Sequence, residues 1–152
     1  MTSAPAWWDD ASIPALLRAA RRTYGNAIRE ELEASGLDDV PRNGSFVLGS
    51  MSRGDAQLSE IIAWLGVSKQ SAGQLIDALV ARGYIDRAVD VEDRRRLIVT
   101  LTDRGSAAAA AIRSAVDSVD TALVERLGTA KIESTREVLA ALIETDHAAH
   151  EH

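Results

Sequence analysis

A break at Gly66-Val67-Ser68 constrains the fold of this 152-residue chain more than any other feature of its sequence. On each side of the break, apolar residues recur at the three- and four-residue spacing of an amphipathic helix. Ser59 is the expected cap of the first helix, and Ser68 is that of the second, which Gly83 ends. Gly66 permits a left-handed turn between them. Two short helices joined in this way are typical of a helix-turn-helix.

After Gly83 the spacing of apolar residues changes from a helical period to alternation. Residues 84–89 alternate as one strand and residues 97–101 as a second, and the charged residues 90–96 connect them. A hairpin that directly follows a helix-turn-helix is a wing. The sequence therefore predicts a winged helix.

Two helices are expected before the winged helix. Ser12 is a suitable cap, Pro14 fits the first turn, and Gly36 ends the helix. A shorter helix is expected at about residues 43–51, followed by a turn at residues 53–55.

Two further helices are expected after the wing. Thr102 is the expected cap of a long helix over residues 103–127, and Thr129 starts the last one. The predicted fold class is mainly α with a small β wing: a winged helix-turn-helix flanked by N- and C-terminal helices, within a single domain over residues 1–152.

Composition argues against several functions. The chain has no cysteine, and its three histidines are all among the last six residues, so an enzyme and a cofactor are not expected. The tail reads His147-x-x-His150-x-His152, which we interpret as a polar end rather than a metal site. Gly44 and Gly49 have the spacing of a phosphate loop, but the lysine of that loop is missing.

Membrane insertion and secretion are not expected either. No apolar run approaches about 18 residues, and residues 1–10 lack the basic and apolar regions of a secretory signal. We therefore expect a cytoplasmic protein.

Charge is unevenly distributed along the chain. The formal net charge is −6, yet residues 42–105 carry nine Arg and Lys against eight Asp and Glu. A run of three cations, Arg94-Arg95-Arg96, falls in the predicted wing loop. Arginines there are suited to the DNA backbone and to a narrow minor groove. Asp93 is expected to orient a guanidinium by a bidentate contact.

The start of the second helix-turn-helix helix carries polar groups that suit base recognition. In such a motif the N-terminal turns of this helix enter the major groove. Glutamine bonds adenine, lysine reaches guanine or phosphate, and serine donates or accepts. The candidate base-reading residues are Ser68, Lys69, Gln70, Ser71 and Gln74.

Five motifs follow one another along the chain: Leu58-Ser59-Glu60-Ile61, Leu65-Gly66-Val67-Ser68, Leu79-Val80-Ala81-Arg82-Gly83-Tyr84-Ile85, Asp90-Val91-Glu92-Asp93-Arg94-Arg95 and Val99-Thr100-Leu101-Thr102-Asp103-Arg104-Gly105. In this order and spacing, they resemble the MarR family of winged-helix transcription regulators. The resemblance implies that Arg95 is the wing-tip residue of the minor groove and that Asp93 orients it. It also implies a DNA-binding region over about residues 42–102, with dimerisation helices at about 12–36 and 103–148.

Three residues depart from the family pattern: Gly73 inside the recognition helix, Ile62 at a position that is usually small, and Trp64 at one that is usually polar. The resemblance further implies a small, aromatic effector. Tyr24 and Trp64 are candidate walls for it and Arg21 a candidate carboxylate partner, unless these residues pack at the dimer interface.

The expected function is that of a homodimeric regulator, a repressor that binds a pseudo-palindromic site on double-stranded DNA and responds to a small ligand. The alternative is a winged-helix module that binds protein and not DNA.

Overall fold

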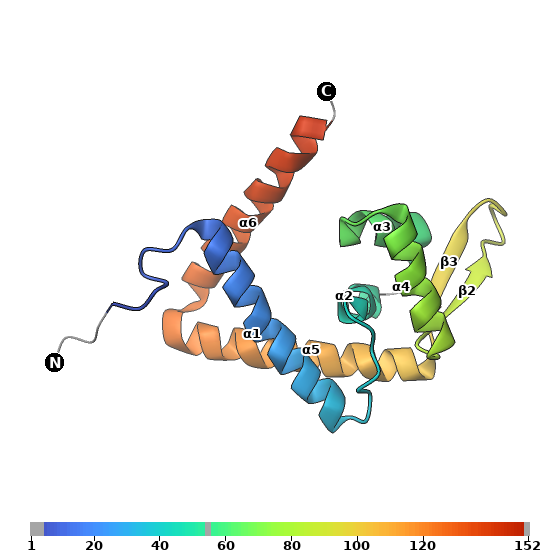
Figure 1. The fold of residues 1–152 in the computed structure, drawn as a ribbon, viewed down its shortest axis with the longest axis horizontal. Helices are drawn as coiled ribbons and strands as arrows, with labels where there is room; N and C mark the ends of the chain where they lie inside the picture. The colour runs from blue at the N-terminus through green and yellow to red at the C-terminus, as the bar shows by residue number, and fades with distance from the viewer. Residues whose placement is uncertain (1–4, 54–55, 151–152) are drawn as a thin grey trace. The chain divides into compact units, whose positions relative to one another are not determined.

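The computed structural model describes residues 5–53 and 56–150. The chain forms two compact units, with the boundary after Val116. The first unit begins with α1 (Ile13–Ala34), α2 (Gly44–Ser50), a 3-10 turn at Met51–Arg53, β1 (Ala56–Gln57) and α3 (Leu58–Leu65). It continues with α4 (Lys69–Ala81), β2 (Ile85–Val89), β3 (Leu97–Leu101) and the start of α5 (Asp103–Leu127), and α6 (Thr129–His150) follows (Figure 1). The expected class, mainly α with a small β wing, is confirmed.

The helix-turn-helix consists of α3 and α4. Gly66 has the left-handed conformation that the turn requires, with φ of 60°. Ser68 caps α4 as predicted, because its Oγ accepts a hydrogen bond of 3.2 Å from the backbone N of Ser71. The predicted cap of α3 is wrong. Gln57 occupies the cap position and forms a capping box with Glu60, whose Oε2 accepts from the Gln57 backbone N at 2.9 Å.

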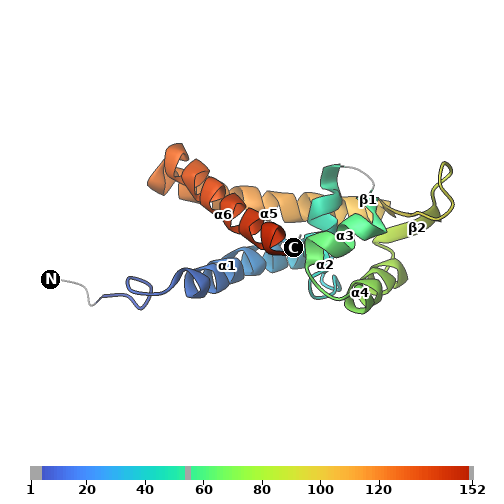
Figure 2. The same ribbon diagram turned by 90° about the horizontal axis from the view of Figure 1, so that it is seen from above.

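The wing is confirmed, but the sheet has a third strand. β2 and β3 pair antiparallel from Ile85 opposite Leu101 to Val89 opposite Leu97. The two-residue strand β1 pairs with the other edge of β3, which gives the order β1-β3-β2. Figure 2 shows β1 directly before α3. A strand this short has too few residues for alternation to reveal it.

The flanking helices begin and end close to where the sequence predicts. Pro14 lies in the first turn of α1, although the side chain of Ser12 makes no capping bond. Gly36 follows α1 with φ of 69°. Thr102 caps α5, since its Oγ1 accepts from the backbone N of Gly105 at 3.0 Å. The predicted turn at residues 53–55 lies largely outside the described residues.

The core of the first unit draws on every helix of that unit and on the sheet. Its largest fully buried side chains come from α2 to β3, with the first half of α5 packed against them. They are Val47, Leu48, Met51, Ile61, Ile76, Leu79, Tyr84, Ile85 and Val99. Because α4 and the wing pack on the same core, the positions from which their exposed side chains project are fixed.

The second unit, from Asp117, holds the rest of α5 and α6. Arg136 on α6 forms an ion pair of 3.3 Å with Asp120 on α5. Three large apolar side chains of α6, Val138, Leu142 and Ile143, are at least half exposed. No helix in the part of the chain that the structure describes has the length and hydropathy needed to cross a membrane.

Candidate nucleic-acid interface

The first turns of α4 present the predicted base-reading residues to solvent. Ser68, Lys69, Gln70, Ser71 and Gln74 are all exposed, while the opposite face of the helix packs into the core. The two serines differ from the other three residues. The Ser68 hydroxyl donates to Ser71 Oγ at 2.9 Å and also caps the helix. Of the five exposed side chains, those of Lys69, Gln70 and Gln74 therefore extend farthest from the helix.

Backbone and side-chain bonds fold the wing loop into a tight turn. Asp90 N donates to the carbonyl oxygen of Arg96 at 3.0 Å, and Arg96 N donates to that of Asp93 at 2.9 Å. Asp93 Oδ1 also accepts from the backbone N of Arg95 at 3.0 Å. The turn thus holds its shape through groups other than the side chains of Arg94 and Arg95, which are left exposed.

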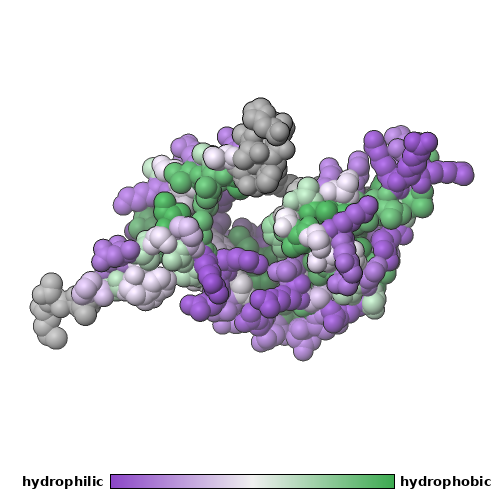
Figure 3. Space-filling model, turned by 45° about the horizontal axis from the view of Figure 1, so that its top comes forward, coloured by the Kyte–Doolittle hydropathy of each residue, from purple (hydrophilic) through white to green (hydrophobic). Residues whose placement is uncertain are grey.

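Asp93 contacts a different guanidinium from the one predicted. Its Oδ2 lies 3.3 Å from Nε of Arg96, whereas it meets Arg95 through the backbone N. The contact is a single Nε···O pair and not the bidentate one expected. Asp93 thus shapes the turn that carries Arg95, and Figure 3 shows the wing tip as a hydrophilic projection of its unit.

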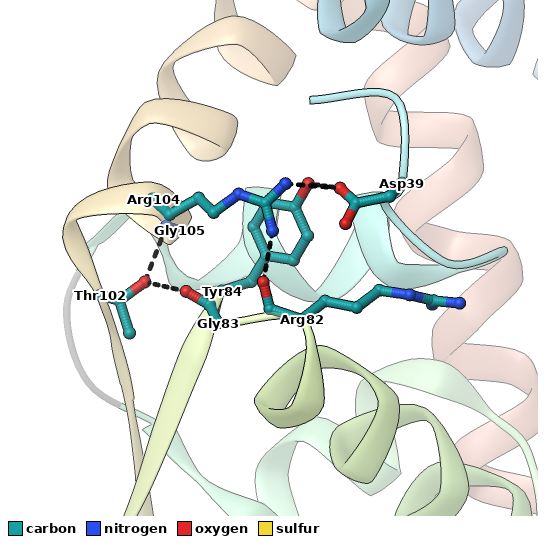
Figure 4. A network of polar contacts seen from close by, with 7 residues as sticks. All are labelled: Asp39, Arg82, Gly83, Tyr84, Thr102, Arg104 and Gly105. Carbon is teal, nitrogen blue, oxygen red and sulfur yellow. Dashed lines mark hydrogen bonds and ion pairs between the residues drawn. The ribbon is translucent and has the colours of Figure 1, made fainter. Parts of the chain in front are cut away.

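A cluster of three side chains, Asp39, Tyr84 and Arg104, joins the root of the wing to the loop after α1 and to the start of α5 (Figure 4). The Tyr84 hydroxyl donates to Asp39, and Arg104 forms an ion pair of 2.8 Å with the same carboxylate. The Arg104 guanidinium also lies 4.4 Å from the centre of the Tyr84 ring and donates to the carbonyl of Arg82 at the end of α4. The cluster therefore connects three places that are distant in sequence: the loop after α1, the junction of α4 with the wing, and the start of α5.

The charge of the cluster is fixed by its geometry. Burial, together with the hydrogen bond to Asp39, raises the pKa of Tyr84 to about 12. The hydrogen bond from Tyr84, together with Arg104, holds the pKa of Asp39 below its usual value. At neutral pH the hydroxyl is therefore the donor and the carboxylate the acceptor.

Thr102 and Gly105 bring α5 against the backbone at the root of the wing. Thr102 Oγ1 donates to the carbonyl of Gly83 at 2.6 Å, and its backbone N donates to that of Tyr84 at 3.1 Å. A Cβ on Gly105 would lie 1.9 Å from the Tyr84 oxygen. This close approach explains why the sequence needs a residue without a side chain three positions after the threonine.

Comparison with known proteins identifies this architecture. Residues 38–96, which include α2, the helix-turn-helix and β2, match the model of the MarR family. Over these residues the chain is similar to the MarR family. A curated relative, the transcriptional repressor MprA of Escherichia coli strain K12, is 34% identical over 74 residues, which cover 49% of this chain and 42% of that protein. The match thus spans about two fifths of the length of the relative.

Solved structures share the fold over most of the chain. A crystal structure of the MepR–DNA complex of S. aureus has a TM-score of 0.71 at 21% identity and covers 90% of this chain and 99% of that one. NadR in complex with 4-hydroxyphenylacetate has a TM-score of 0.68 at 24% identity, with 91% and 97% covered. At these identities the similarity establishes the MarR fold.

The structure places one of the predicted effector residues, Arg21, at a groove. Arg21 lines an open groove of about 290 Å³ along the second half of α1 and the loop to α2, where its Nη2 lies 3.4 Å from Asn43 Oδ1. Tyr24 is half-buried and is not among the residues that line this groove. The side chain of Trp64 lies outside the described residues.

The other groove residues were missing from the sequence prediction. Two further arginines, Arg29 and Arg42, line the groove with Arg21, as do two acidic residues, Glu33 and Asp38. Among the residues whose side chains the structure describes, no group of three acidic, histidine or cysteine side chains could hold a metal ion. The histidines of the C-terminal tail lie beyond that part.

Proposed function

We propose that this protein is a DNA-binding transcription regulator of the MarR family. The observation that carries the proposal is the placement, on one packed unit, of an exposed polar helix start and an exposed arginine loop. The first offers hydrogen-bonding groups of base-reading length at Gln70 and Gln74, and the second offers cations at Arg94 and Arg95. Neither feature serves the core of the unit, which is built from other residues.

In the proposed complex α4 lies in the major groove and the wing follows the adjacent minor groove. Gln70 and Gln74 read base edges, and Ser68 supports them by capping the helix at the backbone N of Ser71. Lys69 and Arg96 contact phosphates, while Arg95 enters the minor groove, where negative potential is concentrated. Asp93 contributes by holding the turn that presents Arg95.

The protein is further proposed to act as a homodimer. Exposed apolar side chains on α1 (Ile13, Leu16 and Leu17) and on α6 (Val138, Leu142 and Ile143) favour a partner on each of these helices. A two-fold symmetric dimer is the commonest way in which a protein covers such faces. A dimer of winged helices would bind a pseudo-palindromic site, and the relative MprA favours the action of a repressor.

The arginine-lined groove beside α1 is the proposed site of a small effector. Arg21, Arg29 and Arg42 suit a carboxylate or another anion, and the structure of NadR holds a small aromatic acid. We propose no catalytic activity, because the curated relative is a transcriptional repressor. Since the proposed target is DNA, the proposed location is the cytoplasm.

Selection of DNA fragments tests the function directly. The protein is incubated with random duplexes and with its own upstream DNA, and retained fragments are sequenced. We expect a symmetric motif whose half-sites lie about 10 base pairs, or a multiple of that distance, apart. Gln74→Ala should relax selectivity at one position of each half-site at a cost of about 1–3 kcal/mol.

Arg113→Ala is a suitable control, because it removes an exposed cation from α5 outside both the reading helix and the wing. It should leave the selected motif unchanged. Retention of no duplex at any salt concentration would contradict the proposal and favour a winged helix that binds protein.

A further inference from the structure

An ion pair joins the recognition helix to the wing. Asp77 lies in the second half of α4 and Arg87 at the middle of β2, and Asp77 Oδ1 is 2.7 Å from Arg87 Nη2. Their side chains are 62% and 38% exposed, respectively. The pair therefore lies at the surface, between the two elements that are proposed to enter neighbouring grooves.

Asp77 shares a helix face with the proposed base readers. Gln70, Gln74 and Asp77 are separated by four and then three residues, a spacing that places them on one stripe of α4. All three are exposed. A carboxylate therefore stands one turn beyond Gln74 on the side of the helix that is proposed to face DNA.

Arg87 reaches this stripe because of the register of the wing. It pairs with Val99 on β3, and cross-strand partners project from the same face of a sheet. Val99 is fully buried, so this face is the one that packs on the core. Figure 1 shows β2 leaving the C-terminal end of α4 and running beside it. The guanidinium thus spans the space between the wing and the recognition helix.

Neither attraction to DNA nor the stability of the fold explains why an aspartate occupies position 77. A carboxylate on this stripe repels phosphates, and an ion pair this exposed contributes little to the stability of a fold. We propose that Asp77 and Arg87 are positioning residues. They set the separation between recognition helix and wing, so that Gln74 and Arg95 reach their two grooves of one duplex together. This inference rests on the proposed function.

The direction in which Asp77→Ser changes the affinity for DNA tests the inference. Asp77→Ser removes a negative charge beside DNA, so electrostatics alone predicts tighter binding to every duplex. Positioning predicts the opposite for the selected site: about tenfold weaker binding, with binding to random duplexes equal to or tighter than that of the wild type. Asp86→Ser removes a negative charge from the opposite face of β2. It should weaken binding neither to the selected site nor to random duplexes.

A charge swap separates positioning from a direct phosphate contact by Arg87. Arg87→Asp alone should weaken binding at the selected site. Combined with Asp77→Arg it restores the pair in reverse, and affinity should return to within roughly threefold of the wild type. If Asp77→Ser binds the selected site as tightly as the wild type, or if the swap gives no rescue, the inference is wrong.

A distance measurement tests the pair without DNA. Because the chain has no cysteine, spin labels can be attached at Gln74→Cys on α4 and Glu92→Cys on the wing loop. We expect Asp77→Ser to broaden the distance distribution between the labels and Asp86→Ser to leave it unchanged. An unchanged distribution with Asp77→Ser overturns the positioning role. A broadened one, in a protein that retains no duplex, refutes the proposed function and leaves the positioning pair standing.

Discussion

The two halves of α5 lie in different surroundings although they form one continuous helix. In the first half, Ala108, Ala111 and Ile112 are buried in the core that includes the winged helix. From Asp117 onward, among the residues whose side chains the structure describes, none is buried, and the same holds for α6. The first unit thus has a buried core, whereas the second has no buried residue among those described.

This difference assigns separate roles to the two units. The first unit buries enough apolar surface to order the recognition helix and the wing within a single chain. The second exposes Val138, Leu142 and Ile143, which a stable monomer rarely leaves together in water. The part proposed to read DNA is therefore ordered by the core of one chain, while the exposed apolar side chains of α6 are proposed to face a second copy.

The largest effect on stability is expected at the start of α5, next to the root of the wing. Gly105→Ala places a Cβ 1.9 Å from the backbone oxygen of Tyr84. Since backbone cannot move as easily as a side chain, α5 must shift, and we expect a loss of about 3 kcal/mol or more of unfolding free energy. Chemical denaturation measures it.

Gly73→Ala is the matched control, because a Cβ on Gly73 meets nothing within 4 Å. Alanine favours a helix over glycine, so this variant should gain about 1 kcal/mol. Equal effects of the two substitutions would contradict the close approach of α5 to the root of the wing.

A smaller effect, confined to association, is expected in the second unit. Leu142→Gln combined with Ile143→Gln removes apolar area that we propose a partner buries. At about 1.5–3 kcal/mol for each buried side chain, the dimer should dissociate at least tenfold more readily. Sedimentation velocity over a range of concentrations measures this.

Glu144→Gln alters the opposite face of α6 and should leave association unchanged. The cooperative unfolding of the first unit should persist in the double variant. If that variant remains a dimer at all concentrations, or if the wild type is a monomer at micromolar concentration, the assignment of α6 to the dimer interface is wrong.

The smallest effect concerns the cluster at the root of the wing. The raised pKa of Tyr84 means that folding stabilises its protonated form. Its contribution is complete below about pH 10 and is lost as the pH rises towards 12. Tyr84→Phe should therefore flatten the fall in unfolding free energy over this range, which chemical denaturation at a series of pH values measures. The lowered pKa of Asp39 means that folding stabilises its ionised form. The contribution of Asp39 to the unfolding free energy is therefore lost as the pH falls below 3.8.

Local patterns in the sequence predicted most of the fold. Gly66 and Ser68 encode the turn and cap of the helix-turn-helix, and the change of period after Gly83 encodes the wing. Each signal lies within a few residues of the structure that it specifies. The cap of α3 was missed because Gln57 is a less common capping residue than the serine two positions later.

Contacts between distant residues were beyond the reach of such patterns. Asp39 meets Arg104 across 65 positions, and β1 pairs with β3 across more than 40. Asp77 and Arg87 are ten residues apart, yet nothing in either helical or strand spacing indicates that they meet. These contacts depend on how the elements pack, which one sequence does not specify.

The salt dependence of DNA binding by Arg95→Ala tests the central claim most directly. The side chain is exposed and the turn is held by the Arg95 backbone, so the variant should fold as the wild type does. We predict at least about tenfold weaker binding to the selected site. We also predict that the slope of log K against log salt falls by about 0.9 for each phosphate charge that the Arg95 cation neutralises from within the minor groove, twice in a dimer. Affinity and slope both equal to those of the wild type would show that the wing does not bind DNA, which would contradict the account.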